Sequence, residues 1–265
     1  MRVFISVDIE GISSTTSWDE TRTNTEPGVP HAHRMKRELL ATIEGALAGG
    51  ATEIVVRDAH GRAQNFDLEG FPKEVTVLRS YSGHPYLMVE GIDSTFDAAM
   101  FVGYHSAASK PGNPLSHTLT GRPLWIKVNG RVASEFLLYS WACALEGVPS
   151  VLLAGDAQLC LEERELHPKL LTVVMKDGDG GLTRNYSPLR VEEDLRETAK
   201  KAVQQDLSQA RIAIPESFDV EVLYKEHVDA SKASYFPGVK RETSNLVSFS
   251  TTNFVEVLNT LNWLP

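Results

Sequence analysis

Residues 3–7 read Val3-Phe4-Ile5-Ser6-Val7, a short run of apolar and β-branched side chains that ends at the carboxylate of Asp8. An apolar run without the alternation of a half-exposed strand is typical of a strand that is buried on both faces of a sheet. Similar short runs recur along the chain, at 54–56, 75–78, 98–102, 150–153 and 172–175. We therefore expect residues 3–7 to form the first of several buried strands.

Helical segments alternate with these strands. Apolar residues recur at helical spacing over 33–47, and Gly49-Gly50 supplies a stop. Further helices are expected at 136–145, directly after Gly155-Asp156, and at 191–207. Strand and helix in alternation over residues 1–175 predict an α/β fold with a mostly parallel sheet flanked by helices.

The C-terminal fifty residues have a different pattern. Strands are expected at 218–224 and 246–249, and a helix at 252–261, with a boundary near Pro215. We therefore divide the chain into an α/β domain, residues 1–210, and a smaller α+β region, residues 211–265, as a candidate for contacts with substrate or other subunits. Within the first domain, the strongest hairpin signal is Asn129-Gly130 between 125–128 and 131–132. A glycine-rich loop is expected at 176–181.

Composition excludes several classes of protein. Hydrophobic residues make up 42% of the 265 residues, which is enough for a sizeable core. The chain has 26 basic and 35 acidic residues, and the resulting net charge of −9 argues against a surface that binds nucleic acid. No apolar run is long enough for a membrane span, and an acid at position 8 comes too early for a signal peptide, so a cytoplasmic protein is expected. With only two cysteines, any metal would be bound by the eight histidines and by carboxylates.

The first candidate functional residues directly follow the run at 3–7. In Asp8-Ile9-Glu10-Gly11 two carboxylates are two residues apart, and alternate residues of an extended chain point to the same side. Two negative charges this close repel each other, and a cation bound between them would offset the repulsion. In the alternative interpretation, one acid caps the following loop and the other is solvated.

Histidines follow two further strands. His60 comes after the run at 54–56, and His105 comes after the run at 98–102, behind Gly103-Tyr104. Parallel strands bring their carboxyl ends to one edge of the sheet, where such folds bind ligands. Taken singly, each histidine is more typical of a structural or solvated residue. His117, in a loop, and Glu135, at a helix start that the helix dipole also favours, have equally ordinary alternatives.

Taken together, these residues predict a metal centre. Neutral imidazole and carboxylate suit Zn²⁺ better than Mn²⁺ or Fe²⁺. Five ligands exceed the need of one tetrahedral ion, so the natural count is a pair of ions bridged by one carboxylate. Such pairs, ~3.5–4 Å apart, activate water and stabilise the tetrahedral intermediate of amide hydrolysis. The predicted ligands are Asp8, Glu10, Glu135 and two of the histidines, which are His60, His105 and His117.

The other notable residues have ordinary explanations. About twenty residues at 11–30 are rich in Ser, Thr, Asn, Gly and Pro and predict a long loop, a kind that is often functional. His31 and His33 are expected to face solvent, and Cys143 to lie in the core. His84 lies in a predicted turn at 82–85, His167 precedes Pro168, and His227 lies in a charged stretch at 225–227, so no function is assigned to these three.

Over most of residues 1–176 the chain resembles a known family, the zinc-dependent D-aminopeptidases of the dipeptide-operon type. The match is specific because several motifs, their spacings and the order of elements agree. The matching stretches are Ser6-Val7-Asp8-Ile9-Glu10-Gly11-Ile12, Asp58-Ala59-His60, Met88-Val89-Glu90-Gly91, Phe101-Val102-Gly103-Tyr104-His105, Ser116-His117, Asn129-Gly130 and Glu135.

The resemblance implies roles for these residues. Asp8 would bridge two zinc ions per subunit, with Glu10 and His60 completing one site and His105 and Glu135 the other. His117 would match the family's catalytic histidine, which is assigned there as a nucleophile. A general acid/base role is at least as easy to defend from its chemistry. The family also implies a ring-stacked homodecamer whose active sites open into an internal chamber.

The sequence departs from the family pattern in two places. His105 and His117 are twelve residues apart, where the pattern has eleven, and a loop extension at Asn113 would absorb the insertion. The segment after Lys176 is rich in Gly and Asp, where the pattern is more basic and helical, so the departure concerns substrate specificity.

The residues together with this resemblance predict a binuclear zinc metallopeptidase that releases N-terminal D-amino acids from short peptides or amides, by metal-activated water or hydroxide with His117 assisting. The preference for D-residues is implied by the resemblance alone. One alternative is a binuclear metal amidohydrolase that acts on another small amide. Others are a non-catalytic, metal-stabilised peptide-binding protein and a structural subunit that binds no metal. The complete ligand set together with His117 favours catalysis.

Overall fold

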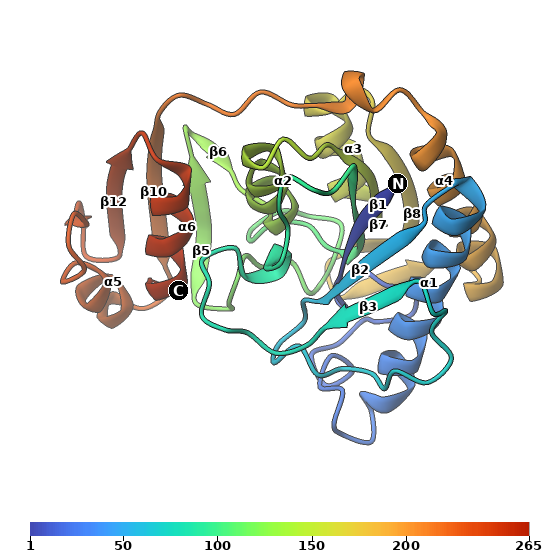
Figure 1. Ribbon diagram of the computed structural model, residues 1–265. Helices are drawn as coiled ribbons and strands as arrows, with labels where there is room; N and C mark the ends of the chain where they lie inside the picture. The colour runs from blue at the N-terminus through green and yellow to red at the C-terminus, as the bar shows by residue number, and fades with distance from the viewer. Residues whose placement is uncertain (265) are drawn as a thin grey trace.

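The computed structural model describes residues 1–264 and contains two sheets (Figure 1). The larger sheet has seven strands in the order β3-β2-β1-β4-β7-β8-β9. The first six are parallel, and β9 is antiparallel to β8. The predicted α/β fold with a mostly parallel sheet is confirmed. Its strands are β1 (Arg2–Val7), β2 (Glu53–Asp58), β3 (Val75–Leu78), β4 (Ala98–Tyr104), β7 (Ser150–Asp156), β8 (Leu171–Asp179) and β9 (Leu182–Asn185).

Helices cover both faces of this sheet. One face packs against α1 (Val29–Gly49) and α4 (Pro188–Gln204), which lie side by side (Figure 1). The other face packs against α2 (Glu135–Leu145) and α3 (Ala157–Leu166). Among residues 1–264, no helix combines the length and the apolarity that crossing a bilayer requires.

The second sheet has five strands in the order β11-β12-β10-β5-β6. The predicted hairpin is present as β5 and β6, and β5 pairs with β10 from the C-terminal region. The division at residue 210 stays a prediction, and the pairing adds that this hairpin lies in the C-terminal sheet. In Figure 1 helix α2 lies between the two sheets. The elements are β5 (Pro123–Val128), β6 (Arg131–Val132), β10 (Phe218–Tyr224), α5 (His227–Ala233), β11 (Lys240–Arg241), β12 (Leu246–Thr251) and α6 (Phe254–Trp263), with short 3-10 helices at Leu87–Val89 and Leu207–Ala210.

The prediction of a loop at 176–181 is wrong. Strand β8 continues to Asp179, and Gly180-Gly181 form the turn into β9. Glycine and aspartate favour loops locally, but here pairing with β9 and the full burial of Lys176 extend the strand.

One expectation for the histidines also needs correction, and the structure adds the burial of a second. His31 does not simply face solvent, because its side chain is 13% exposed and its Nδ1 lies 2.9 Å from the Thr15 hydroxyl. His167 is buried, and its Nδ1 lies 3.0 Å from the carbonyl oxygen of Glu163 at the end of α3. His33, His84 and His227 are exposed. Cys143 is buried, as predicted.

Glu38, on α1, makes the stability of the protein depend on pH. Burial raises its pKa to about 8 from the ordinary value of 4.5, although Ser13 donates hydrogen bonds to the carboxyl group. The folded protein therefore holds this proton more tightly than the unfolded chain, so stability falls as the pH rises from 4.5 towards 8.

We expect Glu38→Gln to remove this loss, which amounts to at most about 1.4 kcal/mol per pH unit. The measurement is the urea unfolding midpoint of both proteins at pH 6 and pH 8. The wild-type midpoint should fall more steeply than that of the variant. Parallel changes in the two proteins would show that other groups are responsible.

Candidate metal centre

Three neighbouring strands end at the same edge of the large sheet and carry the predicted ligands there. In the register of the sheet, Val7 of β1 lies opposite Asp58 of β2 and Val102 of β4. Asp8 follows the first strand, His60 lies two residues beyond the second, and His105 directly follows the third.

The segment after β1 packs tightly on the end of β4. A Cβ atom added to Gly11 would lie 1.8 Å from the carbonyl oxygen of Tyr104, so only glycine fits at this position. The Gly11 N–H donates to the carbonyl oxygen of Gly103, at 2.7 Å. This close approach holds Glu10 beside His105.

Asp8 lies between two histidines and faces each with a different oxygen. Its Oδ1 is 3.2 Å from Nδ1 of His60, and its Oδ2 is 3.5 Å from Nε2 of His105. Glu10 reaches the same side of His60, with Oε2 at 3.1 Å from Nδ1. The structure thus brings these four predicted ligands together.

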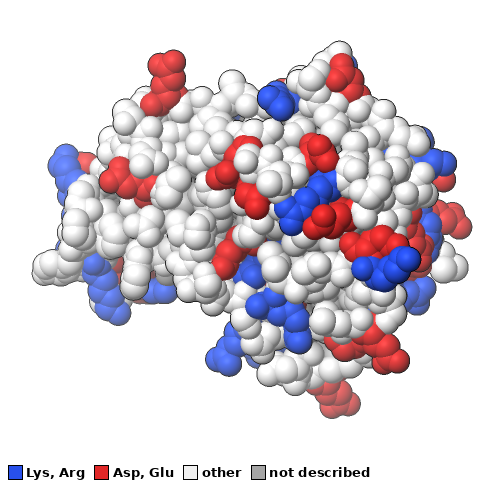
Figure 2. Space-filling model, in the orientation of Figure 1, with Lys and Arg blue, Asp and Glu red and all other residues white. Residues whose placement is uncertain are grey.

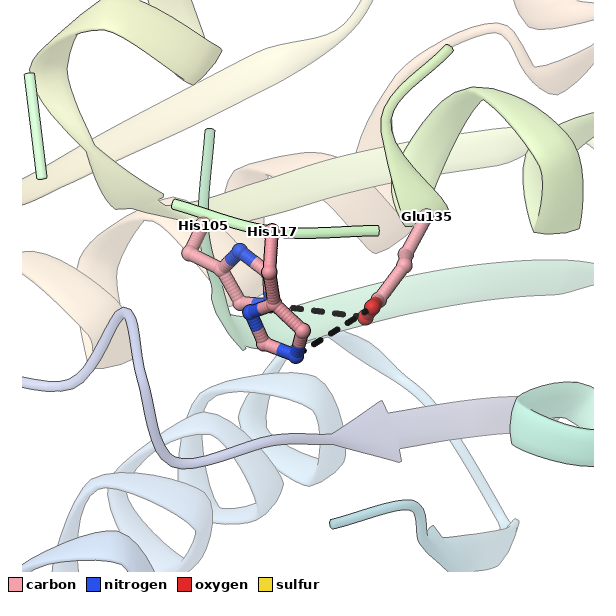
Figure 3. A group of neighbouring side chains, drawn as sticks. All are labelled: His105, His117 and Glu135. Atoms are coloured by element: carbon pink, nitrogen blue, oxygen red, sulfur yellow. Dashed lines mark ion pairs between the residues drawn. The ribbon is translucent and has the colours of Figure 1, made fainter. Parts of the chain in front are cut away.

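Glu135 closes the group from the start of α2, where Ser134 caps the helix. Its Oε2 is 3.4 Å from Nε2 of His105, and its Oε1 is 3.7 Å from Nε2 of His117. The Leu119 N–H donates to Oε1 at 2.6 Å and fixes the carboxylate. Figure 3 shows both imidazole rings turned towards this carboxylate.

Each of the three histidines has one ring nitrogen against a backbone carbonyl. His60 Nε2 is 2.9 Å from the Thr21 oxygen, and His105 Nδ1 is 3.0 Å from the Ser106 oxygen. His117 Nδ1 is 2.9 Å from the Leu115 oxygen. Because a carbonyl only accepts hydrogen bonds, these nitrogens carry the hydrogen, and the opposite nitrogens face the carboxylates. This is the orientation in which a neutral imidazole binds a metal.

Two buried atoms of this group fit the coordination of a cation. Within residues 1–264, Glu10 Oε2 and His105 Nε2 are buried and have no hydrogen-bond partner. Potential ligand atoms lie within 4.8 Å of one another in the set Asp8, Glu10 and His105, and in the set His105, His117 and Glu135. Buried polar groups are normally satisfied, so an ion coordinated by these nitrogens and oxygens accounts for both atoms.

The pKa values show how strongly the carboxylates favour positive charge at this place. Burial opposes protonation of His60 and His105, but nearby carboxylates outweigh it. Glu10 and Asp8 hold the pKa of His60 well above its usual range, and Glu135 raises that of His105 to about 10. Burial and the Glu10 charge raise the pKa of Asp8 to about 7. The site is therefore built for cations.

His117 differs from the other two histidines. Burial and the neighbouring His105 lower its pKa, so the ring is neutral at neutral pH. The two rings are stacked, with centroids 4.3 Å apart and planes 8° apart, and Trp18 packs edge-on against His117 at 5.2 Å. His105 and His117 therefore meet although they are twelve residues apart, and Asn113 in the loop between them is buried.

A cavity of about 360 Å³ opens onto the site and is lined by Asp8, Glu10, His60, His117 and Glu135. Its walls are largely apolar and aromatic, and part of them comes from α6, far along the chain. Apart from Met88, which lies in one of the stretches that match the family, the sequence did not single out these wall residues, because no local motif marks them. The other lining residues include Tyr81, Leu87, Met88, Tyr139, Leu261 and Asn262.

The comparison with protein families agrees with this geometry. A family model described as D-aminopeptidase, peptidase family M55, matches residues 1–263. The chain belongs to the M55 D-aminopeptidase family. A curated D-aminopeptidase of Bacillus subtilis is 29% identical over 261 residues, which cover 97% of this chain and 93% of that protein.

A solved structure shares the fold of this M55 chain. It is the zinc-dependent D-aminopeptidase DppA of Bacillus subtilis, described as a self-compartmentalizing protease. The TM-score is 0.91 at 26% identity, and the match covers 100% of this chain and 96% of that one. The expected family is confirmed.

In this M55 chain, two buried side chains also donate hydrogen bonds to the backbone carbonyl oxygen of Glu10. The buried Lys176 ammonium donates to the carbonyl oxygens of Glu10 and Thr15, and the Asn113 amide donates to the same Glu10 oxygen at 3.0 Å. Asn113 also bonds to Asp156, at 3.2 Å. The residues that the sequence marked as a flexible loop and a loop extension thus support the ligand segment.

Proposed function

We propose that this protein is a zinc metallopeptidase that releases N-terminal D-amino acids from short peptides and amides. The observation that carries the proposal is the position of Asp8, whose two oxygens face two different histidines. Family membership and the zinc-dependent relative support the same reaction.

The arrangement supports two zinc positions that share one carboxylate. Asp8 would bridge them, with Glu10 and His60 on one side and His105 and Glu135 on the other. The nitrogen and oxygen donors are those that zinc prefers, and the separate oxygens of Asp8 give each position its own ligand atom. Zinc held there supplies an activated water and polarises the scissile carbonyl group.

His117 is placed to move protons. Its Nε2 points towards Glu135 and into the cavity, while Nδ1 is occupied by the Leu115 carbonyl. As a neutral base, Nε2 can take a proton from the attacking water and return it to the leaving amine. The Leu119 N–H donates to Glu135 Oε1, and this fixed carboxylate faces the reacting Nε2 of His117.

The partners follow from the same site. The cavity admits a short peptide or an amino-acid amide, and we propose no role for nucleic acid because the chain carries a net charge of −9. The related DppA is described as self-compartmentalizing. We extend this to a homo-oligomer, specifically a homodecamer, of this chain in the cytoplasm.

The direct test is stereoselective hydrolysis. The zinc-loaded protein should hydrolyse D-alanine amide at least about tenfold faster than L-alanine amide, as the initial rates of alanine release would show. Protein treated with a chelator is the control, and added zinc should restore its rate. Equal rates for both enantiomers, or no hydrolysis of the D-amide, would contradict the proposal.

A further inference from the structure

A second cavity adjoins the metal centre. Its volume is about 470 Å³, and it shares His60 and Gly61 with the first cavity. Loop residues that follow β1 and β2 form its walls. They include Arg22, Thr23, Asn24, Arg62, Gln64 and Asn65.

The charge of this second cavity is opposite to that of the protein. Two arginines line it, and no acidic residue among those described does, although the chain has an excess of acids. Arg22 pairs with Asp19 at 3.1 Å, but both side chains are mostly exposed and such pairs are weak. Arg62 forms no hydrogen bond or ion pair with any residue of 1–264. Figure 2 shows basic side chains gathered at the lower centre of this face, near the segment that follows β2.

The walls of the second cavity are fixed to the catalytic segment. The Thr23 hydroxyl donates to the side-chain oxygen of Asn65 at 2.8 Å. The Asn65 amide group in turn donates to Asp58 at 2.6 Å and to the His60 carbonyl at 2.7 Å. These bonds fix Thr23 and Asn65, and with them part of the cavity wall, relative to His60.

We propose that the second cavity binds the C-terminal carboxylate of a short peptide whose scissile bond lies at the metal centre. This rests on the proposed function. Arginine binds carboxylate through two parallel hydrogen bonds, and hydroxyl and amide groups complete the polar wall. Each residue beyond the scissile bond adds about 3.3–3.6 Å. Because the cavity begins at His60 itself, a dipeptide or tripeptide is the length that fits.

The experiment compares D-alanyl-D-alanine with its C-terminal amide, using the zinc-loaded assembled protein. The wild type should show a higher kcat/KM for the free acid, mainly through KM. In Arg62→Ala the ratio of kcat/KM for acid over amide should fall about tenfold. Arg62→Lys should restore part of the ratio, and Arg190→Ala, an exposed arginine on α4, is the matched control.

A binding measurement separates this proposal from the activity itself. Zinc-loaded His117→Ala should bind the acid more tightly than the amide in calorimetry, and adding Arg62→Ala should remove the difference. Equal binding of acid and amide would overturn the subsite, whether or not the protein hydrolyses either one. In a further outcome, inorganic phosphate competes for the cavity in a way that depends on Arg62, while acid and amide bind equally. That result would assign the cavity to phosphate and overturn the carboxylate subsite as well.

Discussion

Asp8→Asn is expected to lower kcat/KM for D-alanine amide by at least about 10³-fold, because metal polarisation and water activation contribute several kcal/mol to such reactions. Asp8 faces His60 with one oxygen and His105 with the other. An amide retains one oxygen donor but replaces the second by an NH₂ group, which cannot bind a cation. The variant should therefore lose one of the two zinc positions.

The measurement pairs kinetics with metal analysis. Bound zinc should fall from two ions per chain to one or fewer, while the exposed carboxyl group of Asp179 serves as the matched control in Asp179→Asn. If Asp8→Asn keeps two zinc ions and full activity, the bridging role is wrong. If zinc is lost from a protein that has also unfolded, Asp8→Glu, which keeps both oxygens, should retain part of the metal and decides the question.

His117→Ala is expected to lower kcat by about 10²–10⁴-fold, the usual contribution of a positioned acid or base. In the proposed site its Nε2 is not needed to complete the ligand set, because the five proposed ligands would suffice for two ions. These are Asp8, Glu10, His60, His105 and Glu135. Zinc content should therefore stay unchanged, and KM should change little.

This variant also separates two roles of the ring. His117 belongs to one of the two groups of potential ligand atoms, together with His105 and Glu135. Loss of one zinc ion in His117→Ala would make it a ligand and contradict the proton-transfer role. Unchanged kcat would contradict both roles. His33→Ala, which removes an exposed histidine on α1, controls for non-specific effects.

Much of the site could be predicted because parallel strands share one edge. Asp8, His60 and His105 all follow apolar runs, so the prediction of strands placed them together before any contact was known. Glu135 was harder to place, because a glutamate at a helix start is common for electrostatic reasons alone. Only the position of α2 relative to the sheet brings its carboxylate to His105.

Other features depend on contacts between distant segments and have no local signal. The hairpin of β5 and β6 was visible in Asn129-Gly130, but its pairing with β10 depends on residues about ninety positions away. Lys176 lies in a stretch whose glycines favour a loop, and its burial against Glu10 is visible only in the folded chain. For the same reason, the sequence marked the loop at 11–30 as functional without singling out Trp18.

The carbonyl contacts of the three histidines bear on the order of folding and metal uptake. Each ring loses its rotational entropy when the backbone folds around it, so zinc enters a site whose ligands are already oriented. In small zinc-dependent domains metal binding itself provides the folding free energy. Here two large hydrophobic clusters, one on each face of the seven-stranded sheet, form without the ligand side chains, so we expect the chain to fold before it takes up metal. In that case removal of the metal would leave the chain folded, and the supply of zinc would control activity separately from stability.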